Sequence, residues 1–194
     1  MSKIQEIYGK VERRERISEE EAVFLYEEGD LATLQKLAQQ IRSEKHQDKT
    51  FYNRNIHFEP TNKCVYACKF CSFARKPKAT KEEGAWDFGT EELKEQLDKY
   101  PVGSLTEVHI TGGVHPDRGV EFGEDLVSFI KRERPEIHVK AFTAVEVTWM
   151  AKVSKLSVKE TLTRLRDAGL DSLPGGGAEI FDSSIRRKIA GGKA

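Results

Sequence analysis

From residue 51 onward the sequence alternates between short strand-like segments, glycine-marked loops and helical segments. Polar and apolar residues alternate over residues 55–59, and this run stops at Pro60, as is typical of a short strand. Strands and helices that alternate along a chain form a parallel sheet with right-handed crossovers. The pattern therefore predicts an α/β fold of about four βα units. Further strands are predicted at residues 106–111, 137–145 and 170–173, and helices at 91–100, 123–134, 158–168 and from 178 onward.

The unusual residues of this region come directly after the predicted strands, where (β/α) barrels place their sites. A closed barrel of this type needs about 250 residues, whereas the sequence has 194. We therefore expect residues 51–194 to form the N-terminal half of a TIM-type barrel and the chain to be a truncated form. In such a half-barrel the fourth strand has an unpaired edge and an apolar inner face lies open, so we expect little or no turnover by the chain alone.

Residues 1–50 are predicted to form a helical extension with charged outer faces. Ser18 and Glu21 have the spacing of a capping box, which predicts a helix start at this point. The sequence thus divides into a helical segment, 1–50, and a βα region, 51–194.

Composition excludes several classes of function. The 32 basic and 32 acidic residues balance, so bulk charge favours neither nucleic acid nor a membrane surface as a partner. The sequence has no apolar run long enough to span a bilayer and no secretory signal. Its three cysteines lie within eight residues, which argues against a disulfide framework and for a reduced, cytoplasmic setting. Sequence alone does not indicate an oligomeric state.

The three cysteines, Cys64, Cys68 and Cys71, follow the first predicted strand with the spacing C-x3-C-x2-C. Three thiolates at this spacing can surround one iron–sulfur cluster, and a four-iron cluster held by three ligands keeps one iron open for another molecule. Zinc bound by these cysteines and His57 is the alternative, although the sequence has no second C-x2-C pair. A zinc-binding or scaffold module is accordingly a competing, non-catalytic hypothesis.

Four segments in the βα region form a wider pattern around the cysteines, namely FEPTNKCVYACKFCSF, EVHITGGVHPD, VKAFTAVEV and AGLDSLPGGGAEIFD. This pattern resembles the radical S-adenosylmethionine superfamily, and within it the aminofutalosine synthases. The resemblance implies a [4Fe–4S] cluster, S-adenosylmethionine, and addition of a 5′-deoxyadenosyl radical to the enol ether 3-[(1-carboxyvinyl)oxy]benzoate. The product would be 6-amino-6-deoxyfutalosine for menaquinone biosynthesis. A dehypoxanthine futalosine cyclase or an F420-type relative is the alternative within the superfamily.

The resemblance also implies roles for individual residues. The cysteines would bind the cluster, and Phe70 would pack near the adenine. The segment after the second strand would hold the nucleotide's amino end, with Val114 where the wider superfamily often has Glu. Thr143 and Glu146 would contact the nucleotide ribose or the substrate, with a buried salt bridge as the alternative for Glu146. An ordinary strand-to-loop turn is the alternative for the nucleotide-binding segment, which comprises Thr111, Gly112 and Gly113.

Several polar residues are candidates for binding the substrate. His57 and Glu59 share one face of the first strand, and His115 could meet a carboxylate; a structural pair and a solvent-facing histidine are the respective alternatives. The glycines before the last helix could offer amides to an anion, with Glu179 orienting a polar group, although a plain flexible turn explains them too. These glycines are Gly175, Gly176 and Gly177.

A basic patch follows the cysteines and comprises Arg75, Lys76 and Lys78. Such a patch could receive an acidic electron donor such as a flavodoxin or a ferredoxin, whereas solvated lysines are the plain alternative.

Overall fold

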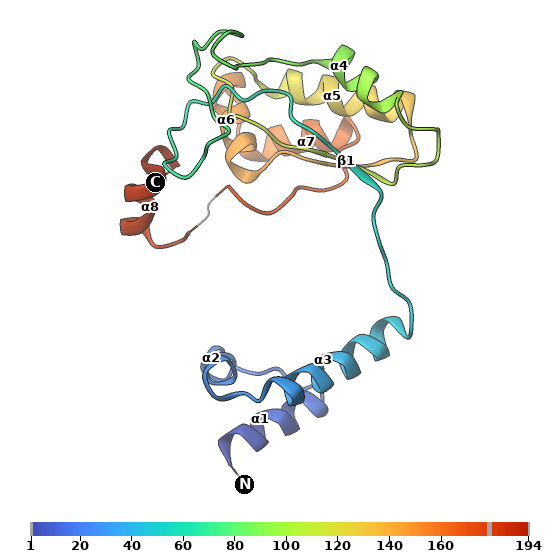
Figure 1. Cartoon of the computed structure of the whole chain (residues 1–194), viewed down its shortest axis with the longest axis vertical. Coiled ribbons are helices and arrows are strands. Elements are labelled where there is room, and N and C mark those ends of the chain that lie inside the picture. The colour runs from blue at the N-terminus through green and yellow to red at the C-terminus, as the bar shows by residue number, and fades with distance from the viewer. Residues whose placement is uncertain (1, 178–179, 194) are drawn as a thin grey trace. The chain divides into compact units, whose positions relative to one another are not determined.

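The computed structural model describes residues 2–177 and 180–193. The chain divides into two compact units, Met1–Tyr52 and Asn53–Ala194 (Figure 1). Each unit is described below by itself. Among the described residues, none of the helices combines the length and apolar character needed to cross a membrane.

The first unit contains three helices, α1 (Lys3–Glu12), α2 (Glu19–Glu28) and α3 (Leu31–His46). The predicted capping box before α2 is confirmed. The Ser18 side chain accepts a hydrogen bond from the Glu21 amide, and the Glu21 carboxylate accepts one from the Ser18 amide at 2.8 Å. Two apolar side chains are buried between the helices, Ile7 and Leu37.

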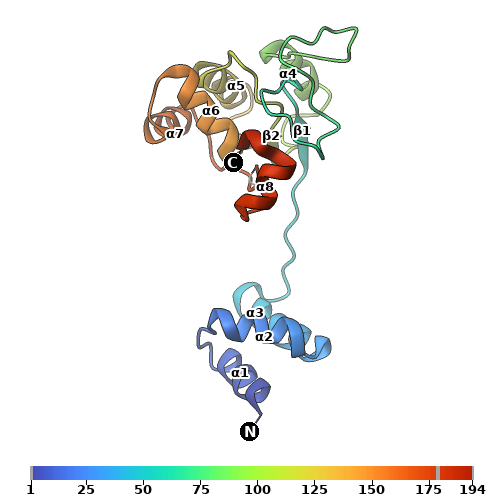
Figure 2. The same cartoon turned by 90° about the vertical axis from the view of Figure 1, so that its left-hand side faces the viewer.

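The second unit is built on a parallel sheet of three strands, ordered β1 (Asn55–Phe58), β2 (Glu107–Ile110) and β3 (His138–Ala141). The predicted α/β class and parallel pairing are confirmed. The chain passes through helices between and after the strands (Figures 1 and 2). These elements are α4 (Thr90–Leu97), α5 (Val120–Glu133), α6 (Ala144–Ser154), α7 (Val158–Asp167), α8 (Ser183–Ala190) and the short 3-10 helix η1 (Gly191–Lys193).

One strand prediction is wrong, and another strand is shorter than predicted. Residues 170–173 form no strand, because their ladder consists of one isolated bridge between Ser172 and Lys140. The third strand stops at Ala141, and Thr143 caps α6 instead of extending the strand. The β-branched residues of 143–147 favour a strand, but the capping box between Thr143 and Glu146 satisfies the backbone of a helix start. The described residues therefore contain three strands rather than four.

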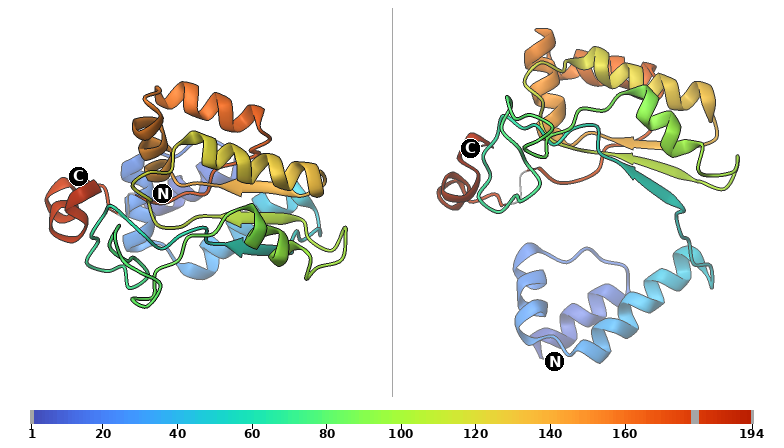
Figure 3. Two further views of the ribbon diagram at one scale, coloured as in Figure 1. Left: turned by 90° about the horizontal axis from the view of Figure 1, so that it is seen from above. Right: turned by 45° about the horizontal axis from the view of Figure 1, so that its top comes forward.

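The two faces of the sheet differ in character. Helices α4, α5 and α7 lie on one side (Figure 3), where the apolar strand residues are buried in the main core. The opposite face is polar, so the expected apolar inner face is wrong. The reason is that all three strands alternate polar and apolar residues, and the helix side receives every apolar one. The polar face comprises Asn55, His57, Glu107, His109, His138 and Lys140.

Candidate cofactor and substrate site

The three cysteines lie on the loop that follows the C-terminal end of β1, and each is half-buried. The loop folds back on itself, since the Cys71 amide donates to the Cys68 carbonyl at 3.1 Å and the Cys64 amide to the Arg75 carbonyl at 2.9 Å. The Tyr66 amide donates to Cys64 Sγ at 3.4 Å. In the described parts of the chain, no three His, Cys, Asp or Glu side chains are arranged as a ready metal site. The loop thus brings the three cysteines into one short segment.

The donor set of this loop fits an iron–sulfur cluster. Thiolates are the ligands that such clusters prefer, and an amide directed at a sulfur stabilises its negative charge. A four-coordinate zinc site would need a fourth ligand. His57 is a poor candidate, because its Nε2 lies 3.3 Å from Thr111 Oγ1 and its Nδ1 3.6 Å from Glu59 Oε1.

The glycine segment after β2 packs directly against the entrance of the cysteine loop. The Gly113 amide donates to the Thr61 carbonyl at 2.6 Å, and the Val65 amide to the Val114 carbonyl at 2.9 Å. A Cβ atom on Gly112 would lie 2.7 Å from the Thr61 carbonyl oxygen, and one on Gly113 would overlap the Lys63 carbonyl. Glycine is therefore needed here for the close approach of two protein backbones, a reason the sequence alone did not provide.

Glu146 connects the start of α6 to the glycine segment. Its carboxylate accepts hydrogen bonds from the Gly112 amide at 3.1 Å, the Thr143 amide at 2.8 Å and the Thr143 hydroxyl at 2.7 Å. Burial raises the pKa of Glu146, although these three hydrogen bonds act in the opposite direction. All of these interactions are internal, so Glu146 positions Gly112 in the structure, and a contact with ribose or substrate remains a prediction.

Asp87, which the sequence analysis did not single out, joins the two loops. It accepts a hydrogen bond from Thr61 Oγ1 at 2.6 Å and pairs with Lys63 Nζ at 2.6 Å, both from the segment before Cys64. On the other side it faces His115 Nε2 at 3.5 Å and Arg118 at 3.7 Å, both from the loop after the glycines. Burial opposes ionisation of Asp87, but the hydrogen bonds from Lys63 and Thr61 lower its pKa on balance.

His115 is consequently held by the protein rather than by solvent. Its Nδ1 accepts a hydrogen bond from the Asp117 amide at 3.2 Å, which leaves Nε2 as the protonated nitrogen facing Asp87 in the neutral ring. Burial lowers the pKa of His115 despite the nearby Asp87 carboxylate. No local signal in the sequence pairs Asp87 with these loops, since 26 positions separate it from Thr61.

The remaining predicted site residues lie at different distances from this junction. Phe70 is 52% exposed on the cysteine loop. Gly177 comes close to the start of α6, because a Cβ atom there would lie 2.8 Å from Val145 Cγ2. Gly175 and Gly176 precede it in the same turn, and Glu179 lies outside the described residues. The cysteine loop also contacts α8, since the Lys69 amide donates to the Ile189 carbonyl at 2.8 Å (Figure 2).

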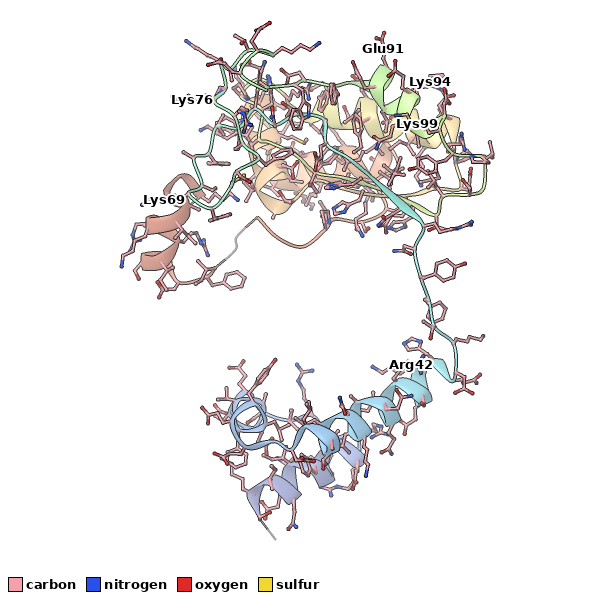
Figure 4. All side chains as sticks on the ribbon, viewed as in Figure 1. Arg42, Lys69, Lys76, Glu91, Lys94 and Lys99 are labelled. Atoms are coloured by element: carbon pink, nitrogen blue, oxygen red, sulfur yellow. The ribbon has the colours of Figure 1, made fainter. Side chains whose placement is uncertain are left out.

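The basic patch is only partly available to a partner. The Arg75 guanidinium donates to the carbonyls of Ser72, Phe73, Ala74 and Glu83, so it supports the loop internally. Lys76 and Lys78 are exposed. Figure 4 shows Lys69 and Lys76 on the cysteine loop, at the end away from the start of β1.

Comparison with known proteins agrees with this geometry. Residues 58–194 match the family described as the Radical SAM superfamily. This chain belongs to the radical SAM superfamily. Members of that superfamily use a [4Fe–4S] cluster and S-adenosylmethionine, and the three cysteines described above are suitable sulfur donors for such a cluster.

Relatives within the radical SAM superfamily are similar over nearly the whole chain. Aminodeoxyfutalosine synthase from Thermus thermophilus is 42% identical over 95% of this chain and 49% of its own length, and the Streptomyces coelicolor enzyme of the same name is 39% identical over 95% and 47%. Cyclic dehypoxanthine futalosine synthase from Streptomyces coelicolor is 37% identical over 90% and 44%. The chain spans about half the length of the curated relatives it matches.

Proposed function

We propose that this chain carries the cofactor-binding machinery of an aminofutalosine synthase. The observation that supports this most strongly is the junction at the C-terminal edge of the sheet, where the cysteine loop and the glycine segment are joined backbone to backbone. The similarity to two aminodeoxyfutalosine synthases favours this enzyme over the cyclase.

The protein residues have distinct parts in this proposal. Cys64, Cys68 and Cys71 hold the cluster as thiolates, and the Tyr66 amide helps to offset the charge on Cys64. When bound, the cluster and S-adenosylmethionine together supply a 5′-deoxyadenosyl radical. The backbone of residues 111–113 receives the amino end of the nucleotide, and Phe70 contacts its adenine.

Two further groups of residues complete the proposed site. Glu146 holds the glycine segment in place through the Gly112 amide. The substrate, 3-[(1-carboxyvinyl)oxy]benzoate, meets the polar face of the sheet through His57 and Glu59, while His115 and the glycines of 175–177 line the rim. The exposed Lys76 and Lys78 receive a flavodoxin or ferredoxin that reduces the cluster.

Product analysis tests this proposal. The full chain is reconstituted anaerobically with iron and sulfide, and then given reductant, S-adenosylmethionine and either the enol-ether benzoate or dehypoxanthine futalosine. Any product that mass spectrometry detects should be 6-amino-6-deoxyfutalosine, formed from the first substrate only, and none should form with the Cys68→Ser variant. Turnover of the second substrate instead would assign the chain to the cyclases, and colourless protein containing zinc would exclude both enzymes.

A further inference from the structure

The polar face of the sheet contains a row of three nitrogen-bearing side chains. The strand register places His57 beside His109 and His109 beside Lys140, so these three residues point to the same side of neighbouring strands. Strands of a parallel sheet are usually covered on both sides and read as continuous apolar runs. Here the helices cover one side and the other carries polar groups, which suits contact with a polar ligand.

His109 occupies the middle of this row and has an unsatisfied nitrogen. Its Nε2 atom is buried and has no hydrogen-bond partner among the residues that the structure describes. The His57 ring stacks on it, with centroids 4.9 Å apart and an angle of 24° between the planes. Burial, followed by the nearby His57 and Lys140, lowers the pKa of His109. Since native proteins leave few buried polar atoms unpaired, such an atom indicates a missing partner.

Lys140 adds a positive charge next to this unpaired nitrogen. Its Nζ pairs with Glu107 Oε1 at 2.7 Å, and an ammonium group has three donors. Glu107 also faces the Asn53 and Asn55 side-chain amides, each at 3.4 Å. The Glu107 carboxylate is therefore already supplied with donors, and Lys140 keeps donors that Glu107 does not use.

The other charged groups on this face are paired with one another. Glu59 Oε1 lies 3.6 Å from His57 Nδ1, and Asp171 pairs with Lys131 Nζ at 2.6 Å and lies 4.0 Å from His138 Nδ1. None of these carboxylates forms a hydrogen bond with His109 Nε2. With the proton on Nε2, His109 is a donor at that atom, and a ligand that satisfies both His109 and Lys140 then offers two acceptor atoms close together, as a carboxylate does.

We propose that His109 and Lys140 bind a carboxylate group of the substrate, with the His57 ring as a cover that turns aside on binding. The inference rests on the proposed function, whose substrate has two carboxylates. His57 is half-exposed, and turning aside would open its contacts to Glu59 at 3.6 Å and Thr111 at 3.3 Å. The row lies two residues before Thr111, or about 7 Å along the strand, so a carboxylate held there directs the rest of the ligand toward the glycine segment.

Binding of a stable dicarboxylate to the full chain tests this inference without turnover. The probe is isophthalate, and its neutral dimethyl ester is the control. In protein labelled with ¹⁵N-histidine, isophthalate should shift the imidazole resonances of His109 and His57, whereas the ester should not. His109→Gln and Lys140→Gln should each weaken isophthalate binding about tenfold or more, because each loses a charge-assisted or buried hydrogen bond. The Lys140→Gln side chain can still donate a hydrogen bond to Glu107, so this variant should remain folded.

His138→Gln is the matched control, because His138 lies on the same face but pairs with Ser172 Oγ at 2.7 Å. It should bind isophthalate as the wild type does. Binding that is unaffected by both test variants, or equal binding of the ester, would overturn the inference, as would the absence of isophthalate binding. A chain that takes up the iron–sulfur cluster but binds isophthalate independently of His109 refutes only this inference. A chain that binds isophthalate through His109 but takes up no cluster refutes only the proposed function.

Discussion

Replacement of Glu146 tests whether α6 holds the glycine segment in place. The side chain is 6% exposed, and its carboxylate accepts three hydrogen bonds, one of them from the Gly112 amide. Glu146→Ala leaves the Gly112 and Thr143 amides without this acceptor, at a cost of about 1–3 kcal/mol each when buried. Both amides are only partly buried, and the variant also removes the cost of burying a carboxylate. We therefore expect the free energy of unfolding to fall by about 2 kcal/mol.

The chain offers a matched control for this substitution. Glu160 has the same position in the capping box of α7, bonded to Ser157, but it is fully exposed and, among the described residues, makes no hydrogen bond to another loop. Urea unfolding followed by tryptophan fluorescence reports on the second unit alone, because both tryptophans, Trp86 and Trp149, lie in it. Equal losses for Glu146→Ala and Glu160→Ala would show that Glu146 is no more than a helix cap, and would refute the connection to Gly112.

The pH dependence of stability, compared between the wild type and a Glu146→Gln variant, provides a second test. Because burial raises the pKa of Glu146 in the folded state above its ordinary value of 4.5, the folded protein holds this proton more tightly than the unfolded chain. Its contribution to stability is fully present below pH 4.5 and is lost as the pH rises through the folded pKa. Glu146→Gln does not titrate, so the unfolding free energy of the wild type minus that of Glu146→Gln should fall from pH 4.5 upward. A signed difference that stays constant or rises over that range would contradict the raised pKa.

Two other substitutions test the junction between the loops. Gly113→Ala should lower the free energy of unfolding by about 1–3 kcal/mol and reduce the iron retained after reconstitution, since a Cβ atom would overlap the Lys63 backbone. Gly191→Ala is the control, because a Cβ atom there would meet nothing within 4 Å, and it should leave urea unfolding unchanged. Asp87→Ala should weaken both iron retention and S-adenosylmethionine affinity, and Asp87→Asn, which keeps an acceptor for Thr61, should weaken them less. Isothermal titration on anaerobic protein measures that affinity, and unchanged values for Asp87→Ala would show that the loops need no such connection.

Short-range patterns predicted much of this fold correctly. The capping box at Ser18 and Glu21 and the helix end before Gly169, whose φ is +110°, each depend on a few neighbouring residues. The alternation of polar and apolar residues along the strands also indicates that one face of the sheet is polar. The expectation of an apolar inner face came from the half-barrel and was wrong. The sequence pattern did not predict the helix at residues 144–154, because Val145 and Val147 favour strands. The local signal for the helix is the capping residue Thr143.

The site was less predictable, because its essential contacts join distant parts of the chain. The cysteine spacing alone indicates the kind of metal centre. The roles of Asp87 and His109 become visible only in the folded structure. There Asp87 pairs with Lys63, and the buried Nε2 atom of His109 has no hydrogen-bond partner among the described residues. No spacing rule connects residues that meet only in the folded structure.

Mössbauer spectroscopy of protein reconstituted with ⁵⁷Fe tests the central claim most directly. If Cys64, Cys68 and Cys71 hold three irons of a [4Fe–4S] cluster, the spectrum should contain one iron site that changes when S-adenosylmethionine is added and three that do not. Protein that takes up no cluster under these conditions, or a cluster whose irons are all unaffected by S-adenosylmethionine, would contradict the account.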